Sequence, residues 1–185
     1  VEGGSNRGRY SILGCDPDLI WMVNKGKINV KYLDTNYEYK LSKQPLQSLR
    51  ELIRISKFKN TDNNVPIPTL VGYLGYPMIQ YMEKINLTNI DNIKIPDATL
   101  IRPKVVAVFD NIKDVISLMV VTYPSKKKNP EKAFANANIL LNKTIRKLEK
   151  SILNNSSNVS KKSKLNFKSN FKINDFYKLV KKAKK

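Results

Sequence analysis

Residues 104–121, KVVAVFDNIKDVISLMVV, contain the strongest local signal in the chain. Two β-branched apolar runs, Val105 to Phe109 and Val115 to Val121, flank a polar segment at residues 110–114. Runs of this composition favour strands inside a sheet, and the polar segment between them is typical of a hairpin turn. The sequence therefore predicts an antiparallel hairpin whose strands lie in the interior of a sheet.

The part of the chain before this hairpin is also rich in predicted strands. Ile28, Val30 and Tyr32 alternate with polar neighbours, a pattern typical of a strand with one buried face and one face in water. We expect strands at residues 9–13, 19–23, 28–33, 37–41 and 69–76, with turns at 25–26 and 34–36. Gly72 and Gly75 interrupt the last of these and indicate a bulge or the close approach of another backbone.

Four helices are predicted from apolar spacing and from start signals. They begin near Pro45, Met78, Pro130 and Asn174. In the long third helix the apolar positions are Phe134, Ala137, Leu141, Ile145, Leu148 and Ile152. Residues 154–164 lack apolar periodicity and read as a linker rich in Ser, Asn and Lys.

The formal net charge of +19, on 185 residues, is concentrated at one end. Residues 126–185 carry 18 basic and 3 acidic side chains, and only six basic residues of the whole chain are Arg. Base edges and phosphates are read mostly by Arg, whereas Lys, Asn and Ile, which number 28, 21 and 18 here, have AT-rich codons. A solvated lysine surface is therefore favoured over a nucleic-acid interface.

Composition excludes several other classes of protein. No apolar run is long enough for a transmembrane helix, and no signal-peptide pattern occurs. A single cysteine, Cys15, excludes an internal disulfide and fits a reducing compartment. The chain has no His, the commonest acid–base catalyst and metal ligand.

Residue types that carry chemistry occur, but each has a plainer structural interpretation. Asp16 and Asp18 flank Pro17 as in a turn, and Asp110 and Asp114 bracket a hairpin turn where both are expected to face water. Cys15 reads as a small buried residue. Gly3, Gly4 and Gly8 match no phosphate-binding pattern, so a loop is favoured. Tyr32, Tyr37 and Tyr39 are read as cross-strand partners more readily than as a single-strand nucleic-acid face. The residues alone support no complete active site.

Several motifs, in order, resemble one known family, anthranilate synthase component I. They are VEGG at 1–4, RYSILGCDPD at 9–18, VGYLGY at 71–76, PDA at 96–98, Arg102-Pro103, VVAVFD at 105–110 and SNF at 169–171. The resemblance covers residues 1–124, similar to the amino-terminal domain, and 168–185, similar to the entry into the chorismate-binding domain. Pro77 stands where the family usually has Asp, which is expected to shorten or redirect the following helix.

The resemblance implies an α+β fold in which two antiparallel sheets pack as a sandwich with flanking helices. It implies an amino-terminal regulatory domain at residues 1–152 lacking its first strand, a linker at 153–167, and a truncated first helix of the catalytic domain at 168–185. The chain is then expected to be cut at both ends, with no catalytic residue in it and no synthase activity of its own.

The implied enzyme converts chorismate and ammonia to anthranilate and pyruvate in tryptophan biosynthesis. Its partners are a glutamine amidotransferase subunit that delivers the ammonia and L-tryptophan as the feedback effector, and its cofactor is Mg²⁺, whose ligands are expected outside this segment. We expect a cytoplasmic protein with no nucleic-acid or membrane partner.

Within this segment, Arg9, Tyr10 and Ser11 are expected to line or support the effector pocket. A core strand with Arg9 capping a loop is an equally open interpretation. Two other functions also remain open, namely the homologous aminodeoxychorismate synthase component I of folate synthesis and a lysine-rich nucleic-acid-binding module.

Overall fold

The computed structural model describes residues 8–34, 39–57, 67, 69–87, 93–123, 129–150 and 168–185. The chain divides into two compact units, Val1–Glu149 and Lys150–Lys185, which are described separately. The predicted linker at 153–167 and the glycines at positions 3 and 4 lie outside the described residues. The predicted domain boundaries therefore stay predictions.

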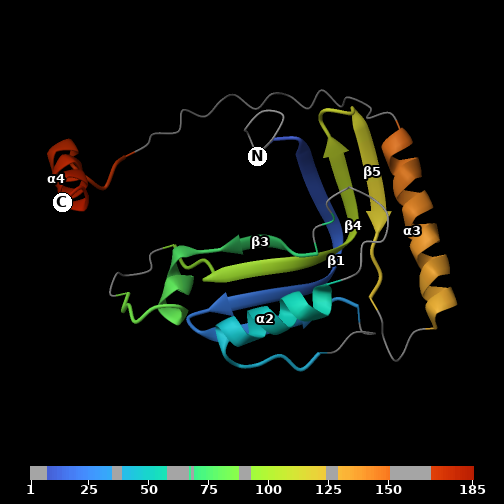
Figure 1. Ribbon diagram of the computed structural model, residues 1–185, viewed down its shortest axis with the longest axis horizontal. Coiled ribbons are helices and arrows are strands. Elements are labelled where there is room, and N and C mark those ends of the chain that lie inside the picture. Colours follow the sequence, from blue (N-terminus) through green and yellow to red (C-terminus); the bar gives the residue numbers. More distant parts are fainter. Residues whose placement is uncertain are drawn as a thin grey trace. The chain divides into compact units, whose positions relative to one another are not determined.

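The first unit is built on one antiparallel sheet (Figure 1). Its strands are β1 (Tyr10–Asn24), β2 (Lys27–Tyr32), β3 (Val71–Leu74), β4 (Ala98–Asp110) and β5 (Val115–Val120). The strand order is β2-β1-β4-β3, and β5 also pairs with β4. The predicted hairpin is confirmed, because Val105 lies opposite Val120 and Asp110 opposite Val115.

The central strand β4 determines how the sheet is divided. One edge of β4 pairs with β1 from Ala98 to Asp110, whereas the other pairs with β3 at Ala98–Ile101 and with β5 at Val105–Asp110. The α+β class with an antiparallel sheet and flanking helices is confirmed. The predicted sandwich of two sheets is corrected: the described strands form a single sheet, because β1 and β4 run through both halves.

The same continuity corrects the two short strands predicted at 9–13 and 19–23. They are the two ends of β1, joined through a register shift between Pro17 and Leu19. Asp16 has a φ of 51° at this point. A β-bulge lets a strand change direction without ending, which is why turn-forming residues occur inside a strand.

Four helical segments are present among the described residues, as predicted, but some of their limits differ. They are α2 (Pro45–Ser56), the 3₁₀ helix η1 (Tyr76–Tyr81), α3 (Pro130–Glu149) and α4 (Ile173–Ala183). Pro77 lies in the first turn of η1, which begins at Tyr76, two residues before the predicted start at Met78. Helix α4 begins at Ile173, so Asn174, the predicted start, lies inside its first turn.

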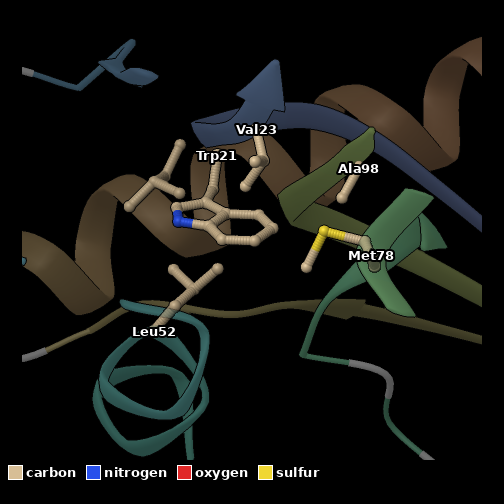
Figure 2. Packing of buried hydrophobic residues seen from close by; sticks show 6 residues of the cluster. Trp21, Val23, Leu52, Met78 and Ala98 are labelled. Atoms are coloured by element: carbon tan, nitrogen blue, oxygen red, sulfur yellow. The ribbon is translucent and has the colours of Figure 1, made fainter. Parts of the chain in front are cut away.

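The core lies between the sheet and α2. Its buried members are Leu19, Trp21, Val23, Leu52, Met78 and Ala98. In Figure 2 the Trp21 ring lies between Leu52 of α2 and the side chains of Met78 and Ala98. The indole Nε1–H donates to Oγ of Ser48 at 2.9 Å, so the only tryptophan in the chain links β1 to α2.

Helix α3 contacts β5 but buries none of its residues fully. Ala137 and Leu141 are half-buried, whereas Phe134 and Leu148 of the predicted apolar face are 69% and 65% exposed. Helix α4, in the second unit, is exposed along its whole length. Among the described residues, none of the helices has the length and apolar character required to cross a membrane.

Candidate functional site

Two of the three residues predicted to form or support an effector pocket begin β1, and the third precedes it. Arg9 donates from Nε to Oδ1 of Asp110 at 3.0 Å and from Nη2 to Oδ2 at 2.7 Å. Its guanidinium carbon lies 4.9 Å from the centre of the Tyr10 ring. Oγ of Ser11 accepts a hydrogen bond from Nδ2 of Asn111 at 3.3 Å. Arg9, Tyr10 and Ser11 therefore lie together beside the β4–β5 turn, and their effector role stays a prediction.

Asp110 is the acceptor that organises this end of the sheet. Besides Arg9, its Oδ1 accepts from the backbone N–H groups of Ile112 and Lys113. The hydrogen bonds from Arg9 make the largest contribution, and together with those from the two N–H groups they lower the pKa of Asp110 to about 2. The expectation that Asp110 faces water is wrong, because its side chain is only 13% exposed and is held by Arg9.

A second arginine–aspartate pair lies inside the protein, between β4 and the bulge of β1. Arg102 donates from Nε to Oδ1 of Asp18 at 2.7 Å and from Nη2 to Oδ2 at 2.9 Å. The side chains are 0% and 1% exposed. Burial acts to lower the pKa of Arg102, but the hydrogen bonds and the charge of Asp18 outweigh it, so the pKa is raised.

Asp18 also holds β2 through its backbone. Its carbonyl oxygen accepts from the N–H groups of Leu33 at 2.8 Å and Asp34 at 3.3 Å. The turn predicted from Asp16 and Asp18 is thus a junction of three strands. A sequence signal for this buried pair exists, because each charged residue adjoins an apolar run. Leu19 follows Asp18, and Ile101 precedes Arg102.

Aromatic rings surround the Arg102 guanidinium. Its carbon lies 3.9 Å from the centre of the Tyr123 ring and 5.7 Å from that of Tyr39. The Tyr32 hydroxyl donates to the carbonyl of Tyr39 at 2.6 Å, and the two rings are 6.3 Å apart. Tyr32 and Tyr39 are therefore packing partners, but they do not pair across two strands, because residues 39–41 of the strand predicted at 37–41 form no strand. Tyr37 lies outside the described residues.

A cavity of about 590 Å³ lies between β2 and the segment before α2. Its lining residues are Gly26, Lys27, Ile28, Val30, Tyr32, Tyr39, Leu41, Ser42 and Lys43. The volume is in the range of small-molecule sites. Arg9, Tyr10 and Ser11 do not line it, so the predicted effector residues and this cavity are different places.

Cys15 is exposed, and the expectation of a buried cysteine is wrong. Asp16 is also exposed and lies 3.5 Å from the Lys104 ammonium, which makes it a surface ion pair. Among the residues that the structure describes, no group of three or more His, Cys, Asp or Glu side chains is placed to hold a metal ion.

Comparison with known proteins gives a consistent result. The chain is 38% identical over 141 residues to anthranilate synthase component 1 of Cereibacter sphaeroides, which covers 74% of this chain and 28% of that relative. It is 29% identical over 196 positions to anthranilate synthase component 1 of Aquifex aeolicus, covering 100% of this chain and 37% of the relative. The chain thus spans about a third of the length of these curated relatives. No protein-family model matches the sequence.

The fold comparison agrees. The crystal structure of anthranilate synthase component I from Streptococcus pneumoniae superposes with a TM-score of 0.67 and covers 99% of this chain and 39% of that one. Its sequence identity is 22%, so this likeness concerns the fold alone. Given the sequence similarity to several relatives of one name, the chain belongs to the anthranilate synthase component 1 family.

Proposed function

We propose that the chain is the amino-terminal, tryptophan-sensing part of an anthranilate synthase component I. The whole enzyme converts chorismate and ammonia to anthranilate and pyruvate in the cytoplasm, as a step of tryptophan biosynthesis. A glutamine amidotransferase subunit delivers the ammonia. The 38% identity to anthranilate synthase component 1 of Cereibacter sphaeroides is the observation that carries this proposal.

The catalytic chemistry is assigned to the rest of the enzyme. The Mg²⁺ that organises the substrate carboxylates is proposed to be held by residues outside this segment. This segment then acts on catalysis indirectly, because effector binding changes how the regulatory domain is placed on the catalytic domain.

The effector site is proposed at the start of β1. The bidentate contact with Asp110 already compensates the charge of Arg9, so Arg9 positions its neighbours and does not bind the effector carboxylate. The Tyr10 ring and the Ser11 hydroxyl remain to contact an aromatic amino acid. Tyr10 is held in place by the Arg9 guanidinium over its ring.

Calorimetric titration of L-tryptophan into the 185-residue chain tests this site. Binding of L-tryptophan but not of L-phenylalanine, weakened at least about tenfold by Tyr10→Ala, is the expected result; tenfold equals about 1.4 kcal/mol. Tyr73→Ala, at a tyrosine that is 40% exposed on β3, is the control and should leave binding unchanged. Equal weakening of L-tryptophan binding by both substitutions would show that the effector site does not lie at the start of β1.

A chimaera distinguishes the proposed enzyme from aminodeoxychorismate synthase. The chain replaces the homologous segment of the Cereibacter sphaeroides protein, and the products formed from chorismate, ammonium and Mg²⁺ are separated by chromatography. Anthranilate that is suppressed by tryptophan supports the proposal, and 4-amino-4-deoxychorismate supports the folate enzyme. The lysine-rich nucleic-acid-binding alternative is tested by a gel mobility assay of the chain with nucleic acid at low salt. The expected result is that the chain does not retard the nucleic acid.

A further inference from the structure

The cavity between β2 and the segment before α2 has one apolar wall, which β2 supplies. Ile28, Val30 and Tyr32 are half-buried, alternate with exposed polar residues along the strand, and line the cavity. The same three side chains pack against the buried core of the first unit. Because the core holds these side chains in place, this wall is fixed by the fold.

The opposite wall, residues 39–43, has no regular secondary structure but is held at two points. The Tyr32 hydroxyl donates to the carbonyl of Tyr39 at 2.6 Å and accepts from its N–H group at 3.2 Å. The N–H group of Ser42 donates to Oε2 of Glu51, on α2, at 2.7 Å. Side chains, and not a backbone ladder, therefore hold this wall, and the space between the walls is a defined part of the structure.

The charge around the cavity is positive. Lys27 and Lys43 are exposed residues of its lining, and none of the nine lining residues is an Asp or a Glu. Among the described residues, neither lysine belongs to an ion pair. Helix α2 begins at Pro45, and its first turn carries no acidic side chain, so its N-terminus adds to the positive potential.

An apolar interior bordered by cations suits a ligand with an apolar body and a negatively charged end. We propose that this cavity binds a small aromatic carboxylate that carries no ammonium group. Its ring packs against Ile28, Val30 and the tyrosine rings, and its carboxylate lies toward the long, flexible side chains of Lys27 and Lys43.

The absence of an acid from the lining sets the specificity of the site. The ammonium group of an amino acid would lie near two lysines with no carboxylate to receive it, so a zwitterion binds less well than a simple carboxylate. The cavity is therefore distinct from the effector site proposed at the start of β1, which takes an amino acid. The inference does not depend on that site or on the proposed enzyme.

NMR spectroscopy of the full, ¹⁵N-labelled chain, titrated with 3-phenylpropionate, tests the ligand class and the place of binding. Saturable shift changes in the amide groups of residues 28–32 and 39–43, with none at residues 105–108 of β4, are the expected result. 3-Phenylpropionamide and L-phenylalanine carry the same ring without a net charge. Both should bind at least about fivefold more weakly, the ratio expected for one exposed ion pair.

Substitutions test the role of the two lysines. The double variant Lys27→Gln, Lys43→Gln should weaken 3-phenylpropionate binding at least about fivefold. Lys31→Gln is the matched control, because Lys31 is an exposed lysine of β2 that does not line the cavity. It removes the same charge and should leave binding unchanged.

Thermal unfolding gives a second measurement, because a ligand that binds only the folded chain raises its Tm. 3-Phenylpropionate should raise the Tm more than the amide does at the same concentration. The proposal is overturned if the full chain shows no saturable binding or if the shift changes lie away from residues 28–32 and 39–43. Equal affinity for the amide, or equal weakening by Lys31→Gln and the double variant, would also overturn it.

Discussion

The two arginine–aspartate pairs that join β1 to β4 differ in how much water reaches them. Arg102 and Asp18 are fully buried, whereas the Arg9 side chain is 33% exposed. Loss of one partner of a buried pair leaves an uncompensated charge in the protein interior. Such a loss costs about 3–5 kcal/mol, against about 0–1 kcal/mol for a surface pair.

Arg102→Leu is therefore expected to lower the free energy of unfolding by about 3–5 kcal/mol. Urea denaturation followed by the fluorescence of Trp21 measures it, because Trp21 is buried in the same unit. Lys104→Gln, which removes the exposed pair with Asp16, is the control and should cost less than about 1 kcal/mol. Similar losses in the free energy of unfolding for the two variants would show that the buried pair contributes no more to stability than the exposed one.

The pair of Arg9 and Asp110 makes stability depend on acid pH. Because the pKa of Asp110 is about 2 in the folded protein against an ordinary value of 3.8, its contribution is complete above 3.8 and is lost as the pH falls toward 2. Asp110→Asn is expected to remove this part of the acid destabilisation. Thermal unfolding at a series of pH values from 5 to 2 measures it, and an unchanged pH profile would contradict the assignment.

Sequence reasoning recognised some of these residues but not their partners. The sequence predicted a common site for Arg9, Tyr10 and Ser11, but it predicted that Asp18 and Asp110 belong to turns. An Asp next to Pro or at a hairpin has the same local sequence whether it faces water or an arginine. About 100 residues separate Arg9 from Asp110, and only the alignment of β1 with β4 brings them together.

At the scale of elements, the β-branched hairpin, the start of α2 at Pro45 and the long α3 are predictable because their signals are local. The union of residues 9–13 and 19–23 in one strand is not, because Pro17 and two Asp residues give a turn pattern that the bulge absorbs. The exposure of Cys15 also depends on which strands flank β1. No property of the cysteine itself determines it.

Gly72 is the element-scale test, because β3 lies against β4 at this point. A Cβ added to Gly72 would come within 2.0 Å of the carbonyl oxygen of Thr99, and no backbone atom there can yield cheaply. Gly72→Ala is expected to lower the free energy of unfolding by more than about 1 kcal/mol in urea denaturation.

The control for Gly72→Ala is Thr69→Ala, just before β3, with an expected cost below about 0.5 kcal/mol. Hydrogen exchange of the β3 amide groups adds a local measurement. Faster exchange in β3 than in β5 is expected for Gly72→Ala, since the two strands pair with different parts of β4. Equal exchange rates in β3 and β5 would show that the substitution at Gly72 does not act on β3 locally.

For the molecule as a whole, the expectation concerns activity. The 185-residue chain, given chorismate, ammonium and Mg²⁺, should form no anthranilate, as followed by the fluorescence of that product. The described residues hold no metal-ligand cluster, and the chain spans 28–37% of two curated relatives. Turnover above the uncatalysed rate would show that the chain carries catalytic residues of its own.

The position of β4 in the sequence has a consequence for how the protein is made. β1 ends at Asn24, and β4, which pairs with β1, β3 and β5, begins at Ala98. At about 5–20 residues per second, a ribosome completes the start of β4 roughly 4–15 s after β1. During that interval the β1–β2 hairpin has no neighbour on its inner edge. The sheet of the first unit is therefore expected to form only after its central strand has emerged.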